Sequence, residues 1–287
     1  MFCYYLSVSG IAIQLESEEE LSVPEAFIPF LTEQTEPDIR AVFRQTAMLS
    51  HTPSQELYRN NVWQICLSAD GYPVRYFYDK PEDQDPYALA IWDGKTLRVE
   101  YLPSEVWRFS LLQHCFFCLD MEQILILRNR LWLHASCVDT PLGGILFSGP
   151  SGIGKSTQAN LWCKYRGARQ INGDRPILSP AGKEWIAWGA PYAGSSRCYV
   201  NDNCPVCAIV MLKQADQCSS RRLNLREAFR AIWSGLAIYS WDRDYVERAS
   251  SLAMKLIETV PVYEFCCTPD EQAVIYLEQA LRKELRI

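Results

Sequence analysis

The chain has 287 residues, with 28 Lys and Arg against 34 Asp and Glu, which gives a net charge of −6 at pH 7. Hydrophobic residues make up 48% and charged residues 22%, a composition that excludes wholesale disorder and suits one large domain or two modest ones. The acidic balance argues against nonspecific nucleic-acid binding, which needs a basic surface, so we expect no nucleic-acid partner.

The N-terminal segment lacks the features of a signal peptide. Residues 1–20 have no basic region, and their apolar residues alternate with polar ones. The stretch most similar to a membrane span, 109–127, is interrupted by polar residues between Gln113 and Gln123. We therefore expect a cytoplasmic protein with no membrane partner.

The first third of the chain is rich in strand signals. Residues 4–15 alternate loosely between apolar and polar. Further β-prone runs lie at 62–67, 74–78, 87–91 and 96–101. Asp93-Gly94 separates the last two runs and predicts a hairpin turn, because such a turn requires positive φ. We assign residues 1–102 to a β-rich N-terminal domain.

The remaining residues, 103–287, alternate between helical and strand patterns, which predicts an α/β domain. Helices are expected at 104–128, 155–165, 225–239, 242–259 and from 268 onward. Asn224 with Glu227, and Thr268 with Glu271, are the expected helix caps. Strands are expected at 131–138, 144–148, 170–171, 177–178, 185–188, 206–213 and 262–266.

Twelve cysteines include two Cys-x-x-Cys pairs, Cys115/Cys118 and Cys204/Cys207. Four thiolates could form a zinc site. The first pair, however, lies inside an apolar helical pattern, and the pairs are far apart in the sequence. This arrangement favours reduced cysteines that pack as small apolar residues, so we expect no bound zinc.

Residues 149–157, Gly-Pro-Ser-Gly-Ile-Gly-Lys-Ser-Thr, match the phosphate-binding pattern G-x-x-x-x-G-K-[ST] in full. Backbone N–H groups freed by the glycines, together with a helix N-terminus, bind phosphate. We expect Lys155 to reach the β- and γ-phosphates of a nucleotide and Ser156 to ligate Mg²⁺. The predicted nucleotide-binding residues are Gly149, Ser151, Gly152, Ile153, Gly154, Lys155, Ser156 and Thr157.

Two segments flank this motif. Leu133-His134-Ala135-Ser136 precedes the strand pair that leads into it, and Asn172-Gly173-Asp174-Arg175 follows its helix. This order resembles the catalytic domain of the HPr serine kinase/phosphorylase family and of the related kinases that modify ribosomal peptides. The resemblance covers residues 130–200 by motif. It implies an α/β P-loop kinase core of the HPr-kinase type that follows the β-rich N-terminal domain.

The resemblance also implies roles for single residues. His134 would line the active site, and Asp174 would hold metal and activate an acceptor hydroxyl. Gly173 stands where the family has the first of two acids. From the residues alone, His134 could instead be a hydrogen-bonded strand histidine and Asp174 a turn former. Arg175 or Arg197 could supply a cation near the γ-phosphate.

The sequence thus predicts a phosphotransferase that uses ATP or another phosphate donor with Mg²⁺. The catalytic residues would be Asp174, His134 and Lys155, and Ser156 and Asp174 would hold the metal. The acceptor would be a Ser hydroxyl of a protein or peptide, recognised by the N-terminal domain. A kinase for a small molecule and a non-catalytic nucleotide-binding regulator stay open as alternatives, and so does homo-oligomerisation.

Overall fold

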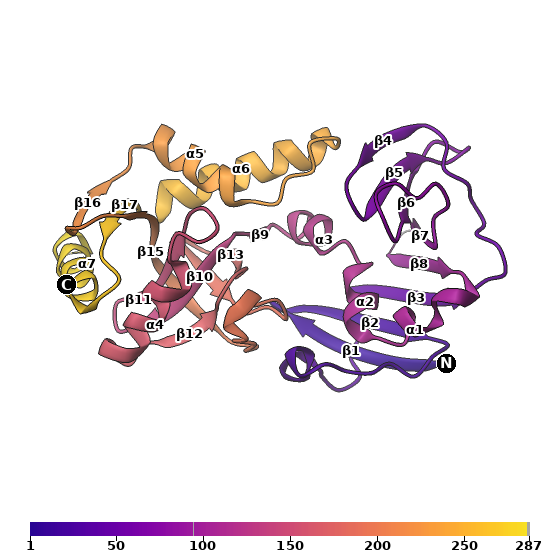
Figure 1. Cartoon of the computed structure of the whole chain (residues 1–287), viewed down its shortest axis with the longest axis horizontal. Helices are drawn as coiled ribbons and strands as arrows, with labels where there is room; N and C mark the ends of the chain where they lie inside the picture. The colour runs from indigo at the N-terminus through magenta and orange to yellow at the C-terminus, as the bar shows by residue number, and fades with distance from the viewer. Residues whose placement is uncertain (94, 286–287) are drawn as a thin grey trace. The chain divides into compact units, whose positions relative to one another are not determined.

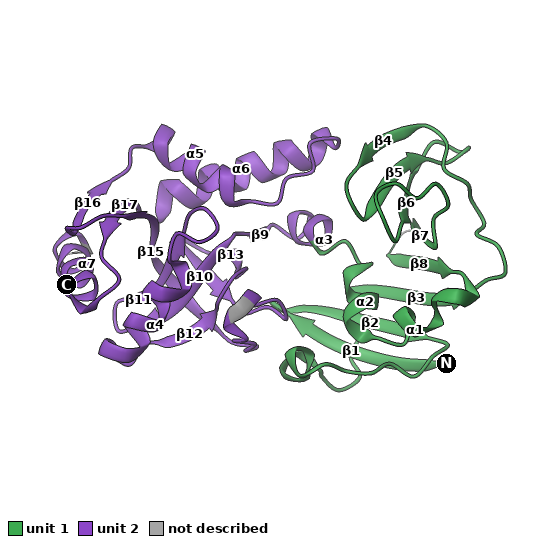
Figure 2. Cartoon of the chain, viewed as in Figure 1, with its two compact units in different colours: residues 1–121 green, residues 122–287 purple. Residues whose placement is uncertain are grey.

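The computed structural model describes residues 1–93 and 95–285. The chain forms two compact units, residues 1–121 and 122–287 (Figures 1 and 2). The division falls at 121/122 rather than at the expected 102/103, because residues after 102 pack into the first unit. The ring of Phe109 stacks on Tyr101 with centroids 4.1 Å apart, and Phe116 meets Phe27 edge-on at 5.2 Å.

Unit 1 is built on a sheet of eight strands among its described residues. The strands are β1 (Phe2–Val8), β2 (Ile11–Ser17), β3 (Ile39–Gln45), β4 (Glu56–Arg59), β5 (Trp63–Leu67), β6 (Pro73–Phe77), β7 (Ala88–Asp93) and β8 (Thr96–Tyr101), and a 3-10 helix, η1 (Glu25–Phe30), follows β2. Their order is β1-β2-β3-β8-β7-β6-β5-β4. β7 and β8 form the predicted hairpin, and its Gly94 lies outside the described residues.

The prediction of a single helix at 104–128 is wrong. The segment instead contains η2 (Pro103–Glu105), α1 (Val106–Phe109), α2 (Leu112–Phe117) and α3 (Met121–Leu127). The helical path breaks where Leu111 adopts an extended backbone and where Asp120 takes a φ of 61°. The Asp120 carboxylate pairs with the guanidinium of Arg75 on β6, so a tertiary ion pair accompanies a backbone conformation that local periodicity does not reveal.

Unit 2 is mixed α/β. Its strands are β9 (Leu131–Trp132), β10 (Ala135–Thr140), β11 (Gly143–Ser148), β12 (Arg169–Asn172), β13 (Ile177–Ala181), β14 (Glu184–Trp188), β15 (Asn203–Gln214), β16 (Ser219–Arg222) and β17 (Val262–Cys267). Its helices are α4 (Lys155–Arg166), α5 (Leu225–Gly235), α6 (Arg243–Thr259) and α7 (Glu271–Leu285), with a 3-10 turn η3 (Gly194–Ser196). No helix among residues 1–93 and 95–285 combines the length and apolar character needed to cross a bilayer.

Three neighbouring strands of the unit 2 sheet run parallel to one another. β15 lies between β11 and β17 and runs parallel to both. Their carboxyl ends therefore meet at the same edge, where ligands of such sheets bind. α4 and α7 pack on each other over one face, around the buried rings of Phe147, Trp162 and Phe265. α5 and α6 lie side by side (Figure 1).

Local differences from the expected elements have tertiary causes. The strand expected at 131–138 is divided into β9 and β10. α5 ends at Gly235 rather than at 239, because Leu236 becomes extended and bridges Leu133. At the start of α7, the carboxylate of Asp270, rather than the Thr268 hydroxyl, accepts a hydrogen bond from the Gln272 N–H.

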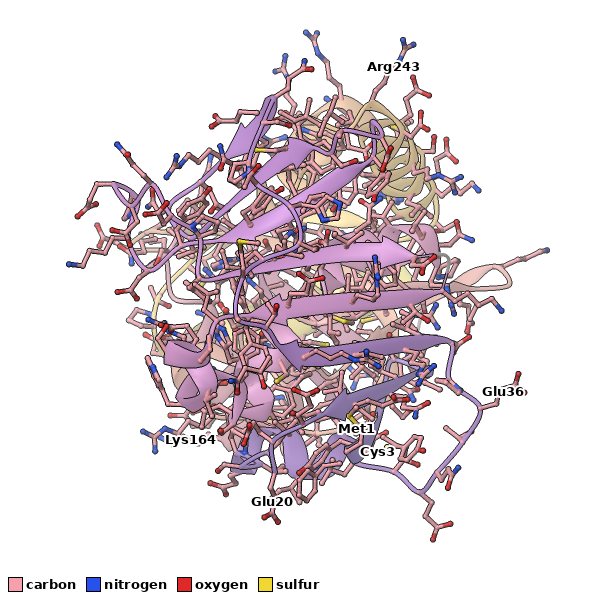
Figure 3. The ribbon with its side chains drawn as sticks, turned by 90° about the vertical axis from the view of Figure 1, so that its right-hand side faces the viewer. Met1, Cys3, Glu20, Glu36, Lys164 and Arg243 are labelled. Carbon is pink, nitrogen blue, oxygen red and sulfur yellow. The ribbon has the colours of Figure 1, made fainter. Side chains whose placement is uncertain are left out.

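The two Cys-x-x-Cys pairs lie in different units. Cys115 and Cys118 are fully buried, and burial raises the pKa of both thiols. In unit 2 burial raises the pKa of Cys207 to about 12. Within the described residues, no three His, Cys, Asp or Glu side chains gather where they could hold a metal. Figure 3 shows that a charged side chain such as Glu36 projects away from the ribbon.

His114 makes unit 1 sensitive to acid. Its ring is enclosed by Tyr87, Phe109 and Phe117, and burial, reinforced by the charge of Arg108, lowers its pKa from 6.5 to about 4. The unfolded chain takes up this proton at higher pH than the folded chain, so stability falls as pH drops from about 6.5 to about 4, by about 3 kcal/mol.

Urea unfolding of the wild-type protein and of His114→Phe at pH 7 and pH 4.5 measures this effect. His114→Phe should lose much less stability on acidification than the wild type. The control, His51→Gln, removes a histidine that bonds to Ser50 at the surface and should keep the wild-type loss. Equal losses in all three proteins would show that His114 does not control the acid sensitivity.

Candidate functional site

The glycine-rich loop, residues 149–154, joins β11 to α4. Gly149, Gly152 and Gly154 have φ values of 142°, 78° and 109°, which residues with a Cβ rarely adopt. The Lys155 Nζ donates hydrogen bonds to the carbonyls of Gly149 and Pro150, at 3.0 and 3.1 Å. Burial lowers the pKa of Lys155, and the charge of Asp174 opposes this effect. Carbonyl groups of the loop thus hold the ammonium group of Lys155. A bound anion would replace these carbonyls as its hydrogen-bond acceptors.

Asn172, at the end of β12, shapes the turn that follows it. We call this turn, residues 173–175, the acidic turn. This side chain is fully buried, and its Oδ1 accepts hydrogen bonds from the N–H groups of Asp174 and Arg175, at 2.9 and 2.7 Å. Its Nδ2 donates to the Tyr192 carbonyl at 2.8 Å. The Ser136 hydroxyl donates to the carbonyl of Gly173 at 2.7 Å. The turn is therefore fixed from β10 and from the 190–192 loop.

His134 lies beside this turn. Its Nε2 is 3.6 Å from the Asp174 Oδ1. Its backbone N–H donates to the Gly235 carbonyl, and its carbonyl accepts from the Ser148 hydroxyl, both at 2.8 Å. Burial, followed by the charge of Lys155, lowers the pKa of His134, while the charge of Asp174 opposes this effect.

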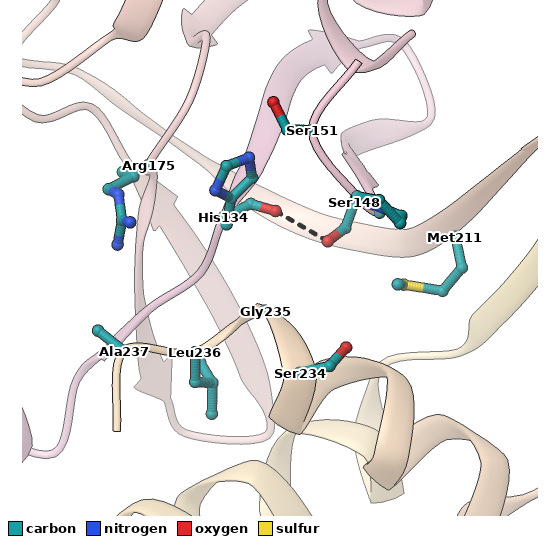
Figure 4. A pocket seen from close by; sticks show the side chains of 11 residues that line it. His134, Ser148, Ser151, Arg175, Met211, Ser234, Gly235, Leu236 and Ala237 are labelled. Atoms are coloured by element: carbon teal, nitrogen blue, oxygen red, sulfur yellow. Dashed lines mark hydrogen bonds between the residues drawn. The ribbon is translucent and has the colours of Figure 1, made fainter. Parts of the chain in front are cut away.

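A cavity of about 450 Å³ opens on this side of the loop (Figure 4). We call it the His134 cavity. Its lining includes His134, Arg175, loop residues 149–151 and residues 234–237, where α5 ends. The backbone carbonyl of Arg175 accepts a hydrogen bond from the Trp132 indole at 2.7 Å, which holds the base of this side chain in place. The predicted cation at Arg175 is thus part of the site.

A second cavity of about 550 Å³ uses the other half of the loop, and we call it the Thr268 cavity. Loop residues 152–154 line it, together with residues 214–216 after β15 and 267–269 after β17. Thr157 and Gln158 of α4 complete the lining. The glycine-rich loop is consequently shared by two cavities, one of which contains the histidine.

Packing explains why Gly173 carries no acid. A Cβ built on Gly173 would lie 1.8 Å from the Ser196 Oγ and 2.3 Å from its Cβ. The turn η3, which carries Ser196, also packs on the acidic turn, because a Cβ on Gly194 would lie 3.0 Å from the Cβ of Asp174. Arg197, the other candidate cation, is exposed and lines neither of the two cavities.

The structure brings His134 and Asp174 within 3.6 Å of each other, and the charge of Asp174 opposes the lowering of the pKa of both His134 and Lys155. Ser156 follows Lys155 at the start of α4 and is half-exposed. Sequence reasoning missed the structural role of Asn172, although Asn before Gly-Asp is a known turn signal. It also missed the part that residues 234–237 play in the cavity, for which no motif exists.

Comparison with known proteins gives little similarity. No protein-family model matches the chain, and no curated protein sequence matches it. Among solved structures, the chain is similar to the Hpr(Ser) kinase/phosphatase from Coxiella burnetii, with 14% identity, a TM-score of 0.31, and coverage of 54% of this chain and 95% of that one. Similarity at this level supports no inference about activity. Any such inference has to come from the residues of this chain.

The contact at Gly173 can be tested by a double-mutant cycle. Gly173→Ala should destabilise the protein by about 1–3 kcal/mol, because the added methyl group overlaps Ser196. Ser196→Gly alone should cost about 1 kcal/mol through its lost hydrogen bond to Ala193. The double variant should be more stable than the sum of the single losses predicts. Additive losses, measured by urea unfolding, would contradict the close packing of these residues.

Proposed function

We propose that the chain is a Mg²⁺-dependent kinase that transfers the terminal phosphate of a nucleotide to an acceptor hydroxyl. The observation that carries this proposal is the proximity of His134 and Asp174, 3.6 Å apart, because His134 also lines a cavity together with residues of the phosphate-binding motif. The sequence resemblance to HPr serine kinases supports a Ser of a protein or peptide as the acceptor.

The donor phosphates would bind at the glycine-rich loop. A phosphate oxygen is a stronger partner for an ammonium than a neutral carbonyl, because a hydrogen bond between two charged groups is stronger. The Lys155 Nζ would therefore exchange the Gly149 and Pro150 carbonyls for the phosphate chain. The N–H groups at the start of α4 add the partial positive charge of a helix N-terminus.

The residues present fit a magnesium ion that binds together with the nucleotide. Mg²⁺ usually keeps several waters and takes one or two carboxylates plus substrate phosphates, rather than a complete protein cage. Ser156 and Asp174 are both half-exposed and would be its protein ligands. When bound, the ion would neutralise charge that develops on the transferred phosphoryl group.

The acceptor hydroxyl would enter the His134 cavity. A hydroxyl has a high pKa, so a positioned base must take its proton as the new P–O bond forms. The Asp174 carboxylate would be this base, since Asn172 fixes its turn. His134 would orient the carboxylate or accept a hydrogen bond, and Arg175 would stabilise negative charge on the phosphoryl group.

A kinase for a small molecule is a second candidate. The volume of the His134 cavity, about 450 Å³, falls within the range of pockets that enclose a small ligand. The same residues would then perform the same chemistry on a free hydroxyl compound. Incubation with labelled ATP and either peptides or small hydroxyl compounds distinguishes the two candidates by the product that carries the label.

Removal of the Lys155 charge tests the donor site. Lys155→Ala should weaken Mg²⁺-ATP binding by about 10–100-fold, because a charged hydrogen bond to phosphate is lost, and should abolish most transfer. Lys164→Ala, on an exposed position of the same helix, is the matched control and should bind like the wild type. Calorimetry and turnover that are both unchanged in Lys155→Ala would refute the assignment.

The Asp174→Asn substitution tests the base. It preserves the shape of the side chain but removes its charge, so the rate of transfer should fall by about 10²–10⁴-fold, while nucleotide binding persists. Glu184→Gln, an exposed change on β14, is the control and should keep the wild-type rate. A wild-type rate in Asp174→Asn would leave Asp174 with only a turn-forming role.

A further inference from the structure

The lining of the Thr268 cavity combines two chemically different kinds of group. The second half of the glycine-rich loop and the start of α4 contribute to it, and N–H groups at such a position attract anions. The exposed carboxylate of Asp216 also lines the cavity. Within the described part of unit 2, no side chain forms an ion pair with Asp216. A ligand that uses both kinds of group carries an anionic group for the loop and hydrogen-bond donors for the carboxylate.

Besides Asp216, the same lining includes a second residue with a hydrogen-bond acceptor that has no donor partner. Gln158 is only 2% exposed, and its Nε2 donates to the Thr268 carbonyl at 3.0 Å. This bond holds the turn after β17 against α4. Its Oε1 is buried and has no hydrogen-bond partner among the described residues. Buried acceptors are usually paired, so the lining is short of donors.

Three apolar side chains also contribute to the lining. Ile153 comes from the loop, Ala215 follows β15 and Pro269 follows β17. These side chains offer flat, uncharged contacts of the kind that a planar ring can cover. Apolar walls with a few convergent polar groups are typical of small-molecule sites, and the volume of about 550 Å³ is within their range.

We propose that the Thr268 cavity binds the nucleoside part of the phosphate donor and that Asp216 accepts a pair of adjacent hydrogen bonds from it. This inference rests on the proposed function, because phosphates at the glycine-rich loop place the attached nucleoside beside residues 152–154. Two groups of a nucleotide offer adjacent donors: the 2′,3′-diol of ribose, and the N1–H and N2–H₂ edge of guanine.

The inference also specifies the class of donor. Inorganic pyrophosphate and polyphosphates carry negative charge and acceptor oxygens at both ends, so they bring no donors to Asp216. A nucleoside triphosphate brings phosphates to the loop and hydrogen-bond donors to Asp216. Donor selection therefore depends on a carboxylate that is remote from the transferred phosphate.

Calorimetry on the full chain with Mg²⁺ tests the inference with four ligands: ATP, GTP, 2′,3′-dideoxy-ATP and inorganic tripolyphosphate. ATP or GTP should bind at least about tenfold more tightly than tripolyphosphate, as expected for one additional pair of good hydrogen bonds. A preference lost in the dideoxy compound assigns the contact to ribose. A preference for GTP over ATP assigns it to the guanine edge.

Asp216→Ala should reduce the preference for nucleotide over tripolyphosphate to about threefold or less, without weakening tripolyphosphate itself. Glu258→Gln, an exposed change on α6, is the control and should keep the wild-type preference. Tripolyphosphate binding as tightly as ATP and GTP, or an intact preference in Asp216→Ala, overturns the inference and leaves phosphate binding at the loop standing. If none of the four ligands binds the wild type, the proposed function itself fails.

Discussion

The candidate site depends on one buried amide. Asn172 accepts hydrogen bonds from Asp174 and Arg175 and donates to the carbonyls of Ala190 and Tyr192. The Asn172 side chain is fully buried, and an unpaired polar group in such a position costs about 1–3 kcal/mol. The acidic turn and the 190–192 loop are therefore coupled, and the Asp174 carboxylate remains 3.6 Å from the His134 ring. Among the described residues, the Asn172 Oδ1 is the acceptor that the backbone N–H groups of Asp174 and Arg175 share.

The candidate site also depends on the parallel arrangement of β11, β15 and β17. It brings three loops that are distant in sequence to one edge of the sheet, with the glycine-rich loop between two cavities. The proposed division of labour follows from this placement. Phosphates would bind at the loop, the acceptor would approach past His134, and the nucleoside would extend past Thr268 toward Asp216.

Sequence patterns predicted the features that depend on local geometry. The strand, the glycine turn and the helix around Lys155 follow from the local pattern of residues 144–165. The hairpin between β7 and β8 was likewise visible, although its Gly94 is outside the described residues. Features set by distant contacts were not predicted. The expected helix at 104–128 breaks at Asp120, which pairs with Arg75, and α5 ends at Gly235, where Leu236 bridges Leu133.

The central claim is that the glycine-rich loop holds the phosphates of a nucleotide beside Asp174. A crystal structure with Mg²⁺ and a non-hydrolysable ATP analogue tests it most directly. The account predicts phosphate oxygens within hydrogen-bonding distance of the N–H groups of the loop, with the Lys155 Nζ moved from the carbonyls of Gly149 and Pro150 onto the phosphates. The account is contradicted if the nucleotide binds elsewhere, or if Lys155 keeps both carbonyl contacts at saturating nucleotide.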